Sequence, residues 1–446
     1  MLELAPDVGG TSRGGTLKGL RHPWGAHYLP IPREDQRALA TLLLELGVAD
    51  GVESDGRLHV PMEYRVRAPA ERVYALGYWE EGLWLQSGEA QQDRDQQELF
   101  EALLNELGRP ADDGRPFELP VKRSSTAQRA LDAQSGTEWA DRHGLTGERM
   151  RWYLEYATRD DFGARLQDTS AWALLHYFNS RLSKTGAGAE YMTWPEGNAW
   201  LVARMREALD VPMHTSHLAT RVRPAESQVE VDVFDVGEAK TTTWTAQHVV
   251  MALPQFVNTR LLEEDPAAEA RRAFRYSPWV VANLHLSEAP LTRGYPQSWD
   301  NVLYHSDSLG YIDATHQIDR SERDALWTWY LPLTDPDERT ARHMLMQRPW
   351  EDWRDIVLND LAASHPGLLE VVTHIDVWRF GHAMVKPVPG FLWGQARKSA
   401  AEALGNVHFA HSDLSGMAIF EEANWQGVRA AEEVCRAMNV DTEALI

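Results

Sequence analysis

The feature of this sequence that most constrains its fold is a short apolar run that ends in an acid and leads into two glycines. The run Leu2-Glu3-Leu4 has the pattern of a strand, and Gly9 and Gly10 follow it in the stretch LELAPDVGGTSR. In dinucleotide-binding sheets an acid at the end of the second strand accepts hydrogen bonds from a ribose. It lies about 20 residues after a glycine-rich turn, G-x-G-x-x-G. The pattern therefore predicts a phosphate-binding turn before Glu3.

The printed sequence contains no such turn. Its only G-x-G, Gly186-Ala187-Gly188, lacks the third glycine and follows a predicted helix instead of a strand. A strand, turn and helix of this kind need about 30 residues. We therefore expect that this unit lies upstream of Met1 and that the chain as printed binds a dinucleotide weakly or not at all. The structure should show a gap or a replacement strand beside residues 2–4.

Composition narrows the classes of partner and site. The chain has 446 residues and a net charge of −22, which disfavours nucleic acid and anionic membrane surfaces as partners. One cysteine, Cys435, excludes an intrachain disulfide and a Cys-rich metal site, and we expect no metal. No stretch is apolar enough for an integral membrane segment, and the printed N-terminus has no secretion signal. We expect a cytoplasmic protein by default, with an export signal possible only in a missing N-terminus.

Segments typical of strands and of helices alternate along the chain. Residues 33–50 and 91–107 have helical periodicity, residues 242–254 read as one buried strand that stops at Pro254, and the last 40 residues read as strand, loop and helix. This alternation predicts an α/β fold with mixed sheets.

Four separated stretches together resemble the superfamily of flavin-containing amine oxidases, protoporphyrinogen oxidases and phytoene desaturases. They follow in the family's order and span nearly the whole chain: LELAPDVGGTSR, then TWPEGNAWLVARM with the strand after it, then HVVMALPQ, then NVHFAHSDLSGMAIFEEANWQGVRAA. The resemblance implies a discontinuous, Rossmann-like FAD/NAD(P)-binding domain from residues 1–55, 190–256 and 376–446. It implies a mixed α+β substrate domain from residues 56–189 and 257–375.

The resemblance also implies FAD as the cofactor and assigns residues to it. Glu3 would hold the adenosine ribose, Val222 would lie at the adenine, and Asp413 would lie at the ribityl chain. The other residues implied to contact FAD are Gly9, Gly10, Arg13, Trp24 and Phe420. The residues alone leave a structural alternative open for several of them. Glu3 could be a solvated acid, Gly9 and Gly10 an ordinary turn, Arg13 a solvated arginine and Val222 an edge-strand valine.

Two further stretches are predicted to form walls of a cleft. RHPWGAHYLPIP places Trp24, His27 and Tyr28 soon after the glycine pair, and WRFGHAMVKPVPG places His382 and Lys386 before the last flavin segment. A histidine can transfer a proton near neutral pH. We therefore take His27, Tyr28, His382 and Lys386 as candidate catalytic residues and expect them to share one pocket with Trp24. The alternative is that the rings only pack.

Several positions depart from the amine oxidase pattern. Val281 and Ala282 stand where a lysine is usual, and no pair of aromatic residues clearly matches an amine cage, Ile419 and Phe420 being nearest. Glu421 and Glu422 replace small residues at the start of the closing helix, and His411 replaces a glycine. These departures put amine oxidation in doubt more than flavin binding, and a desaturase or dehydrogenase acting on another substrate fits better. We expect that simple primary amines and polyamines are not oxidised efficiently.

The predicted function is FAD-dependent oxidation of a small organic molecule, as an oxidase, dehydrogenase or desaturase that moves a hydride from substrate to flavin. An alternative is a flavin-free member of the family that binds a ligand or a partner. An NAD-dependent dehydrogenase ranks last because it needs the same absent turn. The sequence leaves the substrate, the electron acceptor and the oligomeric state open.

Overall fold

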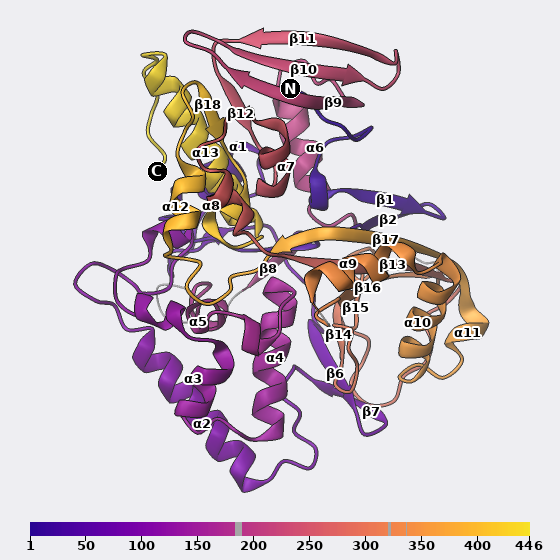
Figure 1. The fold of residues 1–446 in the computed structure, drawn as a ribbon. Coiled ribbons are helices and arrows are strands. Elements are labelled where there is room, and N and C mark those ends of the chain that lie inside the picture. The colour runs from indigo at the N-terminus through magenta and orange to yellow at the C-terminus, as the bar shows by residue number, and fades with distance from the viewer. Residues whose placement is uncertain (183–189, 320–322, 336) are drawn as a thin grey trace.

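A mixed sheet of seven strands forms the largest layer of the fold (Figure 1). The computed structural model describes residues 1–182, 190–319, 323–335 and 337–446, so Gly186-Ala187-Gly188 lies outside the described residues. The strands follow in the spatial order β17 (Val372–Val385), β13 (Tyr276–Leu286), β16 (Ala325–Pro332), β15 (Tyr311–Asp313), β14 (Asp300–Leu303), β6 (Glu71–Ala75) and β7 (Tyr78–Glu81). Neighbours are antiparallel except β14 and β6, which run parallel with Asp300 opposite Glu71.

The two faces of this sheet pack against different partners. Helices α9 (Glu338–Gln347), α10 (Trp350–Ala362) and α11 (Leu368–Val371) contribute to the core on one face, where Trp327 packs with Trp353 and Leu345. The other face carries a second cluster that includes Val73 and Trp279 and meets Tyr156 of α4 (Glu148–Phe162). Because both faces are covered, β13 and β16 are buried along their whole length.

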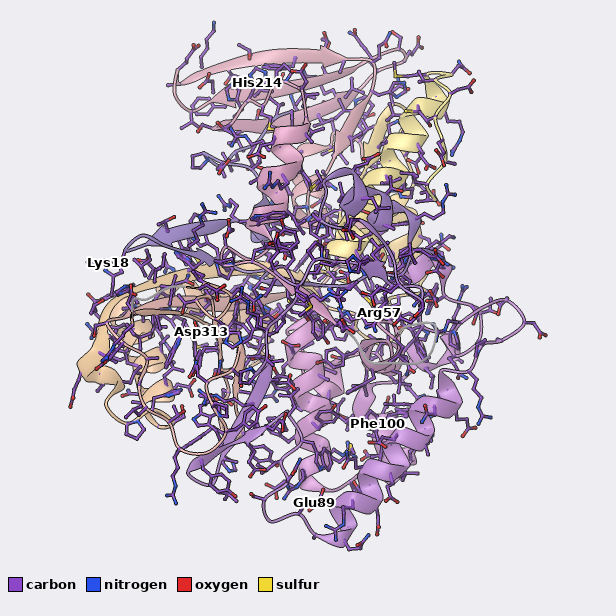
Figure 2. All side chains as sticks on the ribbon, turned by 180° about the vertical axis from the view of Figure 1, so that it is seen from behind. Lys18, Arg57, Glu89, Phe100, His214 and Asp313 are labelled. Carbon is purple, nitrogen blue, oxygen red and sulfur yellow. The ribbon has the colours of Figure 1, made fainter. Side chains whose placement is uncertain are left out.

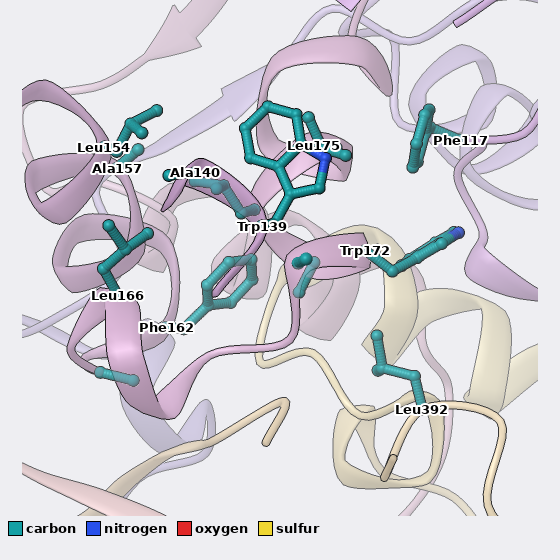
Figure 3. Close-up of a cluster of buried hydrophobic side chains, with 14 of the residues drawn as sticks. Phe117, Trp139, Ala140, Leu154, Ala157, Phe162, Leu166, Trp172, Leu175 and Leu392 are labelled. Carbon is teal, nitrogen blue, oxygen red and sulfur yellow. The ribbon is translucent and has the colours of Figure 1, made fainter. Parts of the chain in front are cut away.

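A helical unit adjoins the sheet and has a core of its own. It contains α2 (Gln91–Leu107), α3 (Gly136–Arg142), α4 and α5 (Ala171–Asn179). Trp139, Phe162 and Trp172 fill its centre, and Leu392 from the C-terminal part of the chain packs against them (Figure 3). This core fixes α4, and with it the acidic residues near the C-terminal end of α4.

A third unit joins segments from distant parts of the chain. β12 (Val249–Met251) and β18 (Val407–Phe409) form a parallel pair. The helices of this unit are α7 (Gln255–Leu261), α8 (Ala268–Arg272), α12 (Gln395–Ala401) and α13 (Phe420–Ala437). Parallel strands with helices between them confirm the predicted α/β class. The predicted domain boundary at 375/376 falls inside β17, which is one continuous strand of the large sheet.

Two sequence predictions about strands are wrong. Residues 2–4 form a single bridge, between Leu2 and His214, instead of a strand. Residues 242–254 are divided between two sheets: β11 (Lys240–Ala246) pairs with β10 (Val229–Asp235), while β12 pairs with β18. The reason is burial, because every residue of β11 is exposed whereas Met251 of β12 lies in the core. Figure 2 shows His214 beside the exposed sheet of β9 (His217–Pro224), β10 and β11.

Short elements complete the chain. They are the hairpins β1 (Gly14–Leu17) with β2 (Leu20–Pro23) and β4 (Gly51–Val52) with β5 (Leu58–His59), the pair β3 (Tyr28–Pro30) and β8 (Tyr191–Thr193), and helices α1 (Arg37–Glu45) and α6 (Ala199–Ala208). Within the described residues, no helix is long and apolar enough to span a bilayer.

Candidate functional site

A cavity of about 170 Å³ lies where the N-terminal segment, the helical unit, the large sheet and the start of α13 meet. Residues 25–28 form one wall, and three hydrogen bonds from different elements hold it. The Tyr330 hydroxyl donates to the Gly25 carbonyl at 2.9 Å, the Asn198 amide donates to the Ala26 carbonyl at 3.1 Å, and the Thr193 hydroxyl donates to the His27 carbonyl at 2.7 Å. The wall is therefore fixed by the fold.

Aromatic rings dominate the inside of the cavity. The ring of His27 lies 5.0 Å from the rings of Tyr28 and Tyr330, and Tyr156 and Trp279 complete this wall. Burial lowers the pKa of His27 to about 4, so its imidazole is neutral at pH 7. Such a lining can stack against an apolar group or face a cation.

Carboxyl groups also face the cavity. Asp160 lies near the end of α4, Asp300 begins β14, and the two acids keep part of their surface accessible because they line the cavity. Burial, followed by the charge of Asp161, raises the pKa of Asp160 to about 7. Burial, followed by the charges of Glu71 and Asp160, raises the pKa of Asp300 well above its usual range. The cavity thus holds acids whose negative charge is not fully balanced by neighbouring cations.

One buried arginine balances part of this charge. Arg181 follows α5, and its Nη2 lies 3.2 Å from Oδ1 of Asp161, while its Nε lies 4.0 Å from Oε1 of Glu421. The side chains are only 7% (Arg181), 4% (Asp161) and 6% (Glu421) exposed. Burial alone would lower the pKa of Arg181, but the charge of Asp161 and, after it, those of Tyr28 and Glu421 raise this pKa well above its usual range, so the charge of Arg181 is permanent. No cluster of His, Cys, Asp or Glu in the described part of the chain could hold a metal ion.

Comparison with known proteins identifies the fold. No protein-family model matches the sequence, and no curated protein matches it. Solved structures do match: a triple mutant of putrescine oxidase redesigned for cofactor binding has a TM-score of 0.69 at 15% identity, over 98% of this chain and 93% of that one. Cyclohexylamine oxidase from Brevibacterium oxydans IH-35A has a TM-score of 0.66 at 14% identity, with the same two coverages. A fatty acid isomerase from P. acnes that produces CLA has a TM-score of 0.66 at 14% identity, over 98% of this chain and 91% of that one.

The chain has the flavin amine oxidase fold. The resemblance inferred from the four sequence stretches is therefore confirmed at the level of the fold. In this flavin amine oxidase fold the cavity is lined from segments 410 residues apart in sequence, from Thr11 to Glu421. Three of the four stretches contribute described lining residues, and HVVMALPQ contributes none.

The structure brings some of the predicted site residues to the cavity and places others elsewhere. His27, Tyr28 and Phe420 line it. Neither Trp24 nor His382 is among the described residues that line it: Trp24 stacks on Trp378 with ring centroids 3.8 Å apart, and His382 stacks on Phe256 at 4.0 Å.

Burial, followed by the charges of Arg342 and Arg260, lowers the pKa of His382 to about 4. Lys386 is also outside the described lining, because its Nζ donates to Oε1 of Glu338 at 2.9 Å. Of the five residues that were expected to share one pocket, His27 and Tyr28 line this cavity. Trp24, His382 and Lys386 make other contacts.

The glycine segment has the conformation that the sequence implies for a close approach. Gly9 and Gly10 have φ values of +124° and +56°, a region that glycine adopts readily. A Cβ on Gly10 would find no described atom within 4 Å, so this side of the turn is open. Arg13 turns back: its Nε donates to the Gly10 carbonyl at 3.1 Å, and its guanidinium lies 5.0 Å from the Trp24 ring.

The two acids and the valine that the resemblance assigns to FAD make contacts within the protein. Oε1 of Glu3 accepts the Ala5 amide at 2.8 Å. Oδ2 of Asp413 accepts the Tyr276 hydroxyl at 2.5 Å and the Gln255 amide at 3.0 Å, and Asp413 is 1% exposed. Val222 is buried in the core around Met251. Asp413 and Val222 thus serve the packing of the chain, whatever else they contact.

The residues at the cavity nevertheless fit a flavin ring system. Buried polar atoms of the lining lack a hydrogen-bond partner among the described residues: Asn198 Oδ1, Asp161 Oδ2 and Trp279 Nε1. A buried polar atom without a partner is costly, so these atoms favour a polar ligand at the cavity. The turn, which is open at Gly10 and closed by Arg13 and Val202 at Gly9, and the half-buried Glu3 would hold the nucleotide end of FAD.

Sequence reasoning missed the acids of the site. Asp160, Asp161 and Arg181 belong to the helical unit, and Glu71 and Asp300 belong to the sheet, so no motif joins them. The signal that was available is local: adjacent acids interrupt an otherwise buried end of α4, and Glu71 and Asp300 begin strands that continue into the core. Val281, noted in place of the family's lysine, does line the cavity.

Proposed function

We propose that the protein oxidises a small organic cation, an amine with apolar substituents, and that FAD at the cavity accepts the hydride. The observation that carries this proposal is that Asp160 and Asp300 face an aromatic cavity at the junction of the units. Carboxylates attract an ammonium, and aromatic faces attract it further. The names of putrescine oxidase and cyclohexylamine oxidase, which have this fold, also support an amine.

The residues of the chain would bind and orient this substrate. Asp160 and Asp300 would pair with the nitrogen, and Tyr156 and Tyr330 would pack on its substituents. His27 is neutral at pH 7, so it adds no positive charge that would compete with the ammonium. When bound, FAD supplies the hydride acceptor, while the cavity supplies position and excludes water.

Simple amines are expected to be poor substrates. Val281 lines the cavity where a lysine is usual in the family, and the walls offer aromatic surface to bulky groups. A second ammonium must leave water to enter the cavity, whereas an apolar substituent gains by packing on Tyr156, Trp279 and Tyr330. The expected order of preference is a substituted benzylic amine, then benzylamine, then putrescine.

The proposal is tested by anaerobic flavin bleaching. FAD is added in excess, and loss of its visible absorbance is followed with N,N-dimethylbenzylamine, benzylamine and putrescine. We expect the substituted amine to bleach the flavin fastest. Asp300→Asn should raise the half-saturating amine concentration by about tenfold to a hundredfold, since a charge-assisted contact is worth about 1.5–3 kcal/mol.

The matched control is Glu98→Gln, an exposed acid on α2, which should leave bleaching unchanged. Fastest bleaching by putrescine would contradict the substrate class. Failure of every amine to bleach bound FAD would contradict the proposed oxidation. If FAD does not bind at all, the flavin-free alternative, which the internal contacts of Glu3 and Asp413 favour, takes its place.

A further inference from the structure

Two acids stand side by side at the start of the one parallel pair of strands in the large sheet. Asp300 of β14 is the register partner of Glu71 of β6. Paired residues on adjacent strands point to the same face, and the strands lie about 4.8 Å apart. Two carboxylates this close in a buried place cannot both ionise without a large cost. The pair therefore favours a state that holds a proton.

The nearby cations are directed elsewhere. Arg72 follows Glu71, but it donates to Asn301 and Gln297 and stacks on Trp79 at 3.8 Å. Arg181 pairs with Asp161. Among the described residues, no lysine or arginine forms an ion pair with Glu71, Asp160 or Asp300.

The remaining groups that act on these acids are neutral phenols and one ion pair. Around Glu71, Asp160 and Asp300 they are Asp161, Arg181, Tyr28, Tyr153, Tyr156, Tyr177, Tyr191 and Tyr330. Burial, followed by the charge of Asp160, raises the pKa of Glu71 to about 7. The acids can therefore change protonation near neutral pH when a charge enters the cavity.

We propose that Glu71 and Asp300 hold a proton between them in the free cavity and that an organic cation entering beside Asp160 displaces this proton. The O–H bond of the carboxyl breaks and the proton passes to water. The cation then balances the negative charge of the carboxylate in place of the proton. One positive charge enters and one leaves, so the net charge of the site is conserved. This inference rests on the proposed function for its ligand class, but it requires neither FAD nor turnover.

The consequence is a pH dependence of cation affinity. Where the pair is protonated, the cation must expel the proton, so affinity rises with pH. Linkage of one proton gives a tenfold rise per pH unit below the titration of the pair and a plateau above it. Affinity should therefore increase at least about tenfold between pH 5.5 and 6.5 and level off once the pair has lost its proton.

The test uses benzyltrimethylammonium, a cation that has no proton of its own. Its binding is measured by calorimetry at pH 7 in two buffers with different heats of ionisation, so that the difference in heat counts the protons released. We expect release of about 0.5–1 proton per cation bound. Absence of release on binding, or absence of binding, would overturn the proposal.

Variants assign the proton to the pair. Glu71→Gln and Asp300→Asn should each lower the release, and the part that remains reports on Asp160, whose pKa of about 7 lets it give up a proton to the same cation. Glu98→Gln should leave the release unchanged, and near-ultraviolet circular dichroism checks that each variant is folded. Undiminished release in both folded variants would overturn the assignment. If a variant does not fold, the pH dependence of affinity in the unaltered protein decides alone. Proton-coupled binding without flavin bleaching would refute the proposed oxidation and leave this inference standing.

Discussion

Replacing Arg181 with methionine should lower the free energy of unfolding by about 3–5 kcal/mol, because removal of one partner leaves buried charges without compensation. Arg181 lies between Asp161 and Glu421, and all three side chains are almost fully buried. Asp160 adds a further carboxyl on the same side. The measurement is urea unfolding at pH 7.5, followed by tryptophan fluorescence and by circular dichroism, so that a departure from a single transition is visible.

Two comparisons separate charge from packing. Arg181→Lys keeps the charge and should cost less than Arg181→Met. Arg204→Met removes an exposed arginine that pairs with Glu207 on the surface of α6 and should cost at most about 1 kcal/mol. The loss in Arg181→Met should also shrink at pH 5, because burial raises the pKa of Glu421 and this carboxyl takes up a proton more readily as the pH falls. A loss below about 1 kcal/mol at pH 7.5 would contradict the role given to this arginine.

Local patterns predicted the elements well where burial follows a regular period. Residues 91–107 form α2 with the predicted bounds, because the segment has one apolar face. The segment 33–50, which also has helical periodicity, forms a helix only over Arg37–Glu45, which is α1. The prediction was wrong at residues 242–254 because the sequence shows apolar content but not which sheet receives it. The exposed threonines of β11 and the buried Met251 belong to different layers.

In the predicted site, too, the sequence located the segments but not which of their side chains face the cavity. The segment that contains Trp24, His27 and Tyr28 was found from its position after the glycine pair, and two of these side chains do line the cavity. Which ring of a segment faces the cavity depends on its tertiary partners. Trp24 stacks on Trp378, and His382 stacks on Phe256. The acids were missed because their juxtaposition depends on the pairing of β6 with β14 and on the packing of α4 against the sheet.

Replacing Asp160 with asparagine should stabilise the protein at alkaline pH, although it removes a proposed substrate contact. The pKa of Asp160 is about 7 in the folded protein, whereas an aspartate in an unfolded chain titrates near 3.9. The unfolded state therefore loses its proton first as the pH rises. From about pH 4 to about pH 7 the native protein binds more protons than the unfolded chain, so this residue makes the native protein less stable with increasing pH.

The size of the stability difference depends on how much of the range from pH 4 to pH 7 the measurements cover. Each pKa unit corresponds to about 1.4 kcal/mol, so the advantage of Asp160→Asn over the unaltered protein should grow by about 2–3 kcal/mol between pH 5 and pH 8. Comparing the two pH values cancels any constant effect of the amide. Urea unfolding of both proteins at both pH values measures this difference, with Glu98→Gln as the exposed control expected to show no such growth. An advantage that is equal at pH 5 and pH 8 would show that Asp160 is ionised throughout. In that case the acids of the cavity would carry a full negative charge before any cation arrives.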